Sequence, residues 1–212
     1  MKNSCYHETA DTAAFAGIVV FFTAIKLQLI LSFCMCSVYC HKIDHMRYSI
    51  NDGFPYYIEL LGDRDFIQLF NSKESLNLLK SLTEEQAAYR YAPDKWSIKQ
   101  IIGHITDHER IMTYRALRFS RKDKTPLPGY DQNTFVDNSR FDELTVSQLT
   151  TDLENVRNAS VSFINSLSKA QLALTGTAWK YELPVESFLK ATIGHEMHHM
   201  GVLKQLYAPA FS

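Results

Sequence analysis

Four stretches of this chain space their apolar residues as amphipathic helices do, and this repetition constrains the fold more than any other feature. They cover residues 65–82, 98–121, 145–168 and 185–207. No sustained alternation of apolar and polar residues indicates a strand, and no Asn-Gly pair indicates a hairpin turn. Four helices that each have one apolar face can bury those faces together. We therefore predict an all-α protein built as a four-helix bundle.

Local signals mark some boundaries of these helices. Ser97 precedes the second apolar stripe and is expected to cap that helix. Pro184 suits the first position of the fourth helix, and Pro209 should stop it. The second and third helices are joined by a long polar connection, residues 122–144. Because this connection can cross the bundle, simple up-down-up-down order is not assured, and we expect part of it to fold over a functional site.

The first 45 residues differ in composition from the rest. They contain one long apolar stretch, residues 13–39, and all four cysteines: Cys5, Cys34, Cys36 and Cys40. The stretch is long enough to span a membrane, although Lys26 and Gln28 interrupt it. We favour Met46 as the true start, with a membrane anchor or a processed leader as the alternatives.

The chain is accordingly divided into an N-terminal extension with an extra apolar helical segment, residues 1–45, and a bundle domain, residues 46–212. Its 22 Lys and Arg residues balance 23 Asp and Glu residues, so it lacks the excess of base that neutralises nucleic-acid phosphates. We expect a small-molecule substrate, no nucleic-acid partner and a cytoplasmic location. A homodimer stays open, as does membrane anchoring through residues 13–39.

Histidines give the bundle domain its candidate chemistry. Two lie on the second helix, His104 and His108, and three on the fourth: His195, His198 and His199. His195 and His199 are four residues apart, so they lie one turn apart on the same helix face. Neutral imidazoles placed in this way can bind a divalent transition metal.

Two known metal motifs overlap at residues 195–199 but lack their other halves. His-Glu-x-x-His zinc proteases take a third ligand downstream, where residues 200–212 contain no His, Asp, Glu or Cys. Di-iron bundles need a second Glu-x-x-His on another helix, whereas the second helix offers Ile-Thr-Asp-His at residues 105–108, with isoleucine at the glutamate position. A mononuclear site with one histidine of the second helix remains, and helical geometry marginally favours His108 over His104.

From about Met46 to Tyr207 the chain resembles the DinB-like family of four-helix-bundle metalloproteins. The segments that carry the resemblance are residues 91–99, 103–110, 114–119, 124–131 and 194–199. The resemblance implies a bundle in up-down-down-up order and a metal triad of His104, His195 and His199. It also implies a divalent metal (zinc, nickel, manganese or iron) and, in some relatives, a low-molecular-weight thiol as cosubstrate.

The resemblance and the residues together suggest a metal-dependent enzyme that performs hydrolysis or thiol transfer on a small molecule. A non-catalytic metal-binding bundle, serving as a sensor or scaffold in a damage or stress response, is the alternative. Asp107, Glu109 and Glu196 are candidates for orienting the imidazoles or acting as a base. Glu109 and Glu196 lie near the apolar stripes, so we expect them to be paired, with Arg115 or Arg118 as candidate partners. Three aromatic residues are candidates for the pocket wall: Trp96, Tyr114 and Trp179.

Overall fold

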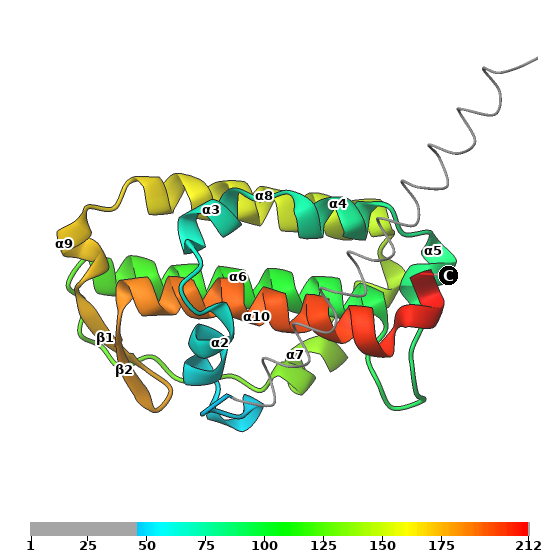
Figure 1. Cartoon of the computed structure of the whole chain (residues 1–212), viewed down its shortest axis with the longest axis horizontal. Helices are drawn as coiled ribbons and strands as arrows, with labels where there is room; N and C mark the ends of the chain where they lie inside the picture. Colours follow the sequence, from blue (N-terminus) through cyan, green and yellow to red (C-terminus); the bar gives the residue numbers. More distant parts are fainter. Residues whose placement is uncertain (1–45, 212) are drawn as a thin grey trace, which may run out of the picture. The chain divides into compact units, whose positions relative to one another are not determined.

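Three long helices dominate the computed structural model, which describes residues 46–211: α6 (Ile98–Ser120), α8 (Val146–Asn165) and α10 (Val185–Leu206). The fourth position of the bundle is filled by two short helices in succession, α3 (Phe66–Asn71) and α4 (Glu74–Lys80), which pack on α8 (Figure 1). The predicted four-helix bundle is confirmed.

Smaller elements connect and cover these helices. Four are short α-helices: α2 (Phe54–Leu61), α5 (Glu84–Ala88), α7 (Gln132–Asp137) and α9 (Lys169–Leu172). Three are single 3-10 turns: η1 (Ile50–Asp52), η2 (Phe141–Glu143) and η3 (Ala208–Phe211). Two strands form an antiparallel hairpin, β1 (Thr175–Ala178) and β2 (Tyr181–Pro184).

The order of helix directions is up-down-down-up. In Figure 1, α3 and α4 run one way along the bundle, α6 and α8 both run the opposite way, and α10 returns. Two contacts fix α10 antiparallel to α6: the Tyr207 hydroxyl bonds the Trp96 carbonyl at one end, and Phe119 packs on Phe188 at the other. Because α6 and α8 are parallel, the connection between them must cross the length of the bundle, as its length suggested.

Capping residues set the starts of α6 and α8. The Ser97 hydroxyl accepts a hydrogen bond from the Gln100 backbone N–H, and the Gln100 side chain bonds back to the Ser97 N–H. Thr145 and Gln148 form the same reciprocal pair at α8. Each pair satisfies donors that the first helical turn leaves free. The predicted cap at Ser97 is therefore confirmed.

The predicted single helix over residues 65–82 is wrong, because the chain leaves helical geometry between α3 and α4. Ser72 has an extended backbone, with ψ of 139°, and its hydroxyl accepts a bond from the Glu74 N–H. A serine that bonds the backbone nearby competes with helix continuation. The apolar spacing persists across the break, which is why periodicity alone did not reveal it.

The hairpin is the second departure from the all-helical expectation. Its two-residue turn is Trp179-Lys180, without the glycine or asparagine typical of such turns, and Trp179 adopts a positive φ of 55°. A Cβ at Gly176 of β1 would lie only 2.1 Å from the Phe119 ring, so the hairpin packs closely over the end of α6. Tertiary packing, which local sequence rules do not see, holds this hairpin.

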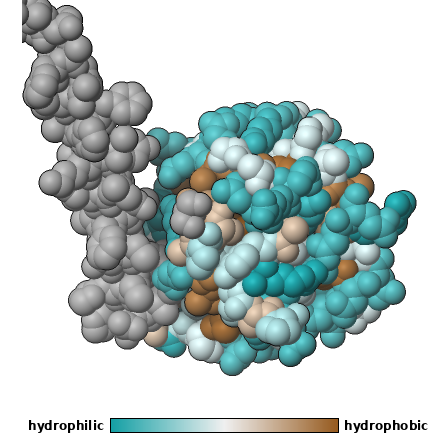
Figure 2. All heavy atoms as spheres, turned by 90° about the vertical axis from the view of Figure 1, so that its right-hand side faces the viewer, coloured by the Kyte–Doolittle hydropathy of each residue, from teal (hydrophilic) through white to brown (hydrophobic). Residues whose placement is uncertain are grey.

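The buried apolar residues form two clusters along the bundle. One includes Phe119, Phe188 and their neighbours at the hairpin end; the other includes Ile102, Leu149 and Leu203 at the end where α6 begins. Figure 2 shows the latter end from outside, where hydrophilic residues cover most of the coloured surface and apolar ones appear in small patches. The apolar stripes therefore mainly face inward.

Within the described part of the chain, no helix combines the length and apolar character that a membrane crossing requires. The apolar stretch 13–39, and the extra helical segment expected there, lie outside the described residues.

Helix α2 crosses α10 at Gly194, where a Cβ would lie 2.0 Å from the Tyr57 carbonyl oxygen. We predict that Gly194→Ala destabilises the protein by about 1–3 kcal/mol, because this clash outweighs the roughly 1 kcal/mol gain in helix propensity. Urea unfolding measures the change. Lys204→Ala, at an exposed position of the same helix, is the control and should stay within about 0.5 kcal/mol. Equal effects of the two substitutions would contradict the close crossing.

Candidate metal centre

A layer of buried polar side chains separates the two apolar clusters. On α6 it lies between Ile102 and Met112, and on α10 between Ile193 and Met200, so it occupies the same level of both helices. Its buried members are His104, His108, Glu109, Arg157, His195 and Glu196, and the partly exposed His199 completes it. Polar groups inside a bundle must be paired with one another or with a ligand. This layer is therefore the candidate site.

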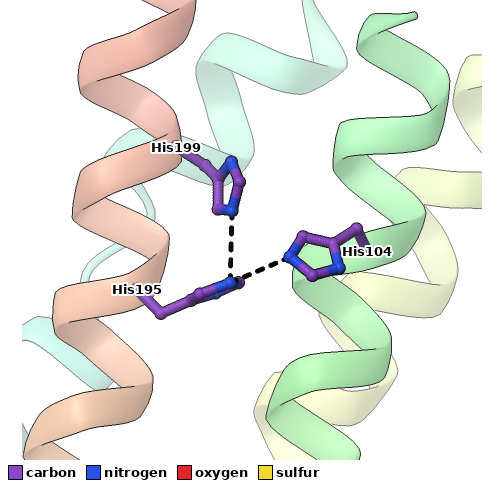
Figure 3. A group of neighbouring side chains, drawn as sticks. All are labelled: His104, His195 and His199. Atoms are coloured by element: carbon purple, nitrogen blue, oxygen red, sulfur yellow. Dashed lines mark hydrogen bonds between the residues drawn. The ribbon is translucent and has the colours of Figure 1, made fainter. Parts of the chain in front are cut away.

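Three histidines of this layer direct one ring nitrogen each toward a common point (Figure 3). The Nε2 atom of His195 lies 2.9 Å from Nε2 of His104 and 3.2 Å from Nε2 of His199. His104 comes from α6 and the other two from successive turns of α10. The candidate ligand nitrogens of these three histidines all lie within 4.8 Å of one another, close enough to share one metal ion.

Hydrogen bonds alone do not account for this arrangement. A ring nitrogen of neutral imidazole either donates one proton or accepts one, so Nε2 of His195 cannot form a full hydrogen bond with both neighbours. Three neutral imidazole nitrogens that converge are a usual donor set for a divalent transition metal, with Zn–N distances of about 2.0–2.1 Å. The residues present therefore fit a divalent cation.

Burial keeps these histidines neutral. Loss of hydration lowers the pKa of His104 from 6.5 to about 4, and the nearby His198 adds to the effect. The pKa values of His195 and His199 also lie well below the ordinary value, mainly through burial. Neutral imidazole is the form that binds metal, so the site does not need to lose protons before it accepts a cation at neutral pH.

The other two histidines lie beside the triad and bond elsewhere. The ring of His108 stacks on His195 with 3.7 Å between centroids, and its Nδ1 bonds the Tyr130 hydroxyl at 2.8 Å. Nδ1 of His198 bonds the Tyr56 hydroxyl at 3.0 Å. The structure thus directs a ring nitrogen of His104, rather than of His108, toward the two histidines of α10, as the family resemblance implied and helical geometry had not resolved.

An open cavity of about 710 Å³ adjoins the triad on the side of His199. Trp96 lines it and also contacts the His104 ring, with 4.8 Å between centroids. Asn133 and Asp137 of α7 line the same cavity, so the long connection does border the site. Trp96 is therefore a wall residue as expected, whereas Tyr114 and Trp179 lie in other surface hollows.

The two buried glutamates pair with an arginine that the sequence analysis missed. Arg157 of α8 bonds Glu109 of α6, with an Nη2–Oε2 distance of 2.8 Å, and also Glu196 of α10. Burial opposes the charge of Arg157, but the two carboxylates outweigh it and raise the pKa of the guanidinium. Arg157 thus ties three helices together at the level of the histidines.

The expected partners of these glutamates were wrong. Arg115 donates to the Pro128 carbonyl, and Arg118 pairs with Asp123. Arg157 was not predicted as their partner because an arginine in an amphipathic helix is usually solvent-exposed. An arginine close to the centre of the α8 stripe, between Leu153 and Ile164, was the available clue.

Asp107 lies at the edge of this layer and pairs with Arg110, with an N–O distance of 3.2 Å. Burial raises the pKa of its carboxyl. Nδ1 of His195 is buried and has no hydrogen-bond partner among the described residues, so no carboxylate orients that ring. A role for Asp107, Glu109 or Glu196 as a base stays a prediction.

A helical bundle with an internal histidine triad beside an open cavity defines a class of protein suited to binding a metal. Comparison with known proteins narrows that class. The family model of the DinB superfamily matches residues 70–203. The chain belongs to the DinB superfamily.

Two relatives illustrate the similarity. An Oceanobacillus iheyensis protein named "Putative metal-dependent hydrolase OB0413" is 27% identical over 128 residues, which cover 59% of this chain and 73% of that protein. The solved structure of YfiT from Bacillus subtilis, titled "a probable metal-dependent hydrolase with an unusual four-helix bundle topology", superposes with a TM-score of 0.57. It is 14% identical and covers 77% of this chain and 91% of its own, so it supports the fold.

Removing Arg157 should be costly, since it leaves two carboxylates buried without a counter-charge. We predict that Arg157→Met lowers the free energy of unfolding by about 3–5 kcal/mol. Arg110→Met, which breaks the more exposed ion pairs with Asp107 and Asp152, should cost about 1 kcal/mol or less. Adding Glu109→Gln and Glu196→Gln to Arg157→Met should recover part of the loss. Urea unfolding that shows equal costs for the two arginines would contradict the buried cluster.

Acidification should destabilise the metal-free protein. The pKa of the His104 imidazole is 6.5 in the unfolded chain and about 4 in the folded protein. Between these two pH values the unfolded chain binds more protons than the folded protein, so a falling pH favours unfolding. Each such histidine contributes up to about 1.4 kcal/mol per pH unit. Urea midpoints with chelator present should therefore fall from pH 7 to pH 5. A constant midpoint over this range would show that the histidines are not buried.

Proposed function

We propose that this chain binds one divalent transition metal through His104, His195 and His199 and catalyses hydrolysis of a small molecule. Convergence of three neutral Nε2 atoms beside an open cavity is the observation that carries the proposal. The name of the Oceanobacillus relative supports hydrolysis as the reaction class.

Each histidine has a defined part in this site. His104 and His195 are almost fully buried, at 2% exposure each, and hold the inner side. His199 is partly exposed and reaches the cavity, so the open side of the site faces the substrate. When bound, a divalent cation supplies Lewis acidity, which acidifies a nucleophile and polarises an oxygen of the substrate.

Aromatic rings pack against the histidines of the triad. Trp96 covers His104, and Tyr57 meets His195 edge-on, with 5.1 Å between ring centroids. The cavity wall continues with Tyr91 and Tyr207, which pack against each other at 5.0 Å. Such a wall favours a substrate with an apolar part.

Thiol transfer is the second reaction open to the same site. Residues 46–211 contain no cysteine, so the bundle domain itself supplies no thiol, and we propose a separate low-molecular-weight thiol as the cosubstrate. A bound cation would lower the pKa of a coordinated thiol as it lowers that of coordinated water. The cavity of about 710 Å³ has room for two small molecules.

Metal binding is the first test. The untagged protein, stripped with chelator, should bind about one zinc, nickel or manganese ion per chain. His199→Ala should weaken this binding at least about 100-fold, because one of three ligands is lost. His198→Ala, on the same turn but outside the triad, is the matched control and should bind normally. Isothermal titration calorimetry makes the comparison, and equal binding by all variants would contradict the site.

Activity separates the reaction classes. The metal-loaded protein is screened against ester and amide substrates, and against electrophiles with added thiols. Turnover that disappears in His199→Ala and persists in His198→Ala supports a metal-dependent enzyme. Metal binding without turnover in either screen would favour a sensor or scaffold, and turnover retained in His199→Ala would place catalysis elsewhere.

A further inference from the structure

A second cavity, of about 520 Å³, lies apart from the one that His199 borders, and the two share no lining residue. Helices α2 and α6, the connection before α7 and the hairpin turn all contribute to it. The residues that line it are Phe54, Arg115, Gly129, Tyr130, Asp131 and Trp179.

Arg115 is a buried cation without a counter-charge. The residue is only 4% exposed, and among residues 46–211 no aspartate or glutamate forms an ion pair with it. It donates one bond to the Pro128 carbonyl at 2.6 Å and contacts the Met112 sulfur at 3.4 Å. Arg157, equally buried, has two carboxylates. A buried charge is costly unless it is paired, so Arg115 is suited to an anion from outside.

Aromatic rings flank this guanidinium. Its central carbon lies 5.8 Å from the centroid of Phe54 and 6.0 Å from that of Tyr130. The planar guanidinium is therefore the polar group between two aromatic walls. Arginine in this setting can hold a carboxylate or phosphate by two parallel hydrogen bonds.

The Trp179 ring is fixed in place although it is 49% exposed. A Cβ at Gly53 would lie 2.8 Å from this ring, and one at Gly129 would lie 3.0 Å from it. The ring therefore packs directly against the backbone of these two glycines. The ammonium group of Lys180 also contacts the indole, 4.3 Å from the ring centroid. A preset, exposed indole beside a cation is a suitable wall for a flat ligand.

Asp131 is the one acidic residue of the cavity lining, and its carboxylate is engaged elsewhere. It caps α7 by accepting a bond from the Thr134 N–H at 3.0 Å. The charge of Arg115 is therefore left for a ligand.

We propose that this cavity binds a small organic anion, whose carboxylate or phosphate pairs with Arg115 while its flat apolar part packs against Trp179. The proposal concerns a second site and does not depend on metal at the histidine triad.

Benzoate and phenyl phosphate are suitable probes, with benzyl alcohol as the neutral control. The full chain is titrated with chelator present, so that a carboxylate cannot bind through a metal. Both anions should bind saturably in calorimetry, and benzyl alcohol should bind at least about tenfold more weakly. Tighter binding of benzoate or of phenyl phosphate would show whether the site prefers a carboxylate or a phosphate. Binding that requires added zinc, or equal binding of the neutral control, would overturn the proposal.

Variants locate the site. Arg115→Gln should weaken benzoate binding at least about tenfold, whereas Arg118→Gln, at a partly exposed arginine on the same helix, should not change it. In a Trp96→Phe background Trp179 is the sole tryptophan, and its fluorescence should change on benzoate binding even if Arg115→Gln fails to fold. Unchanged fluorescence during saturable binding would place the ligand elsewhere and contradict the proposal.

Discussion

The buried pairing of Arg157 with Glu109 and Glu196 is the interaction on which the site depends. Each partner comes from a different helix, and Glu196 directly follows His195 in the chain. A shift of α10 along α6 would separate these charges inside the protein, at a high cost. The ion cluster therefore fixes the register that brings His104 opposite the two histidines of α10.

Two apolar clusters enclose this polar layer from both ends of the bundle. Their packing stabilises the helices, and the close crossing of α2 at Gly194 brings Tyr57 over His195. His104 and His195 are consequently buried, whereas His199 borders an open cavity. A buried donor set with one accessible side is the usual design of a catalytic, rather than structural, metal site.

Much of this fold could be predicted from the sequence, because the periodic spacing of apolar residues indicates long amphipathic helices. The stripe from Ile98 and the cap at Ser97 gave α6 almost to the residue. The break at Ser72 and the hairpin around Trp179 could not be predicted in this way. Both depend on local hydrogen bonds or tertiary contacts that leave the apolar spacing unchanged.

The candidate site was only partly predictable for a similar reason. The spacing of His195 and His199 places them on one face, but no local rule chooses between His104 and His108 across the bundle; the family resemblance made that choice. Arg157 and Arg115 are more instructive, since both are arginines within amphipathic helices. Only three-dimensional packing distinguishes the one with two carboxylates from the one with none.

The most direct test of the central claim is the coordination of zinc in the loaded protein, measured by X-ray absorption or by a crystal structure with anomalous scattering. We predict one zinc ion with three imidazole nitrogens at about 2.0–2.1 Å, from His104, His195 and His199. Coordination by other side chains, or an ion that leaves the His104 ring unbound, would contradict it.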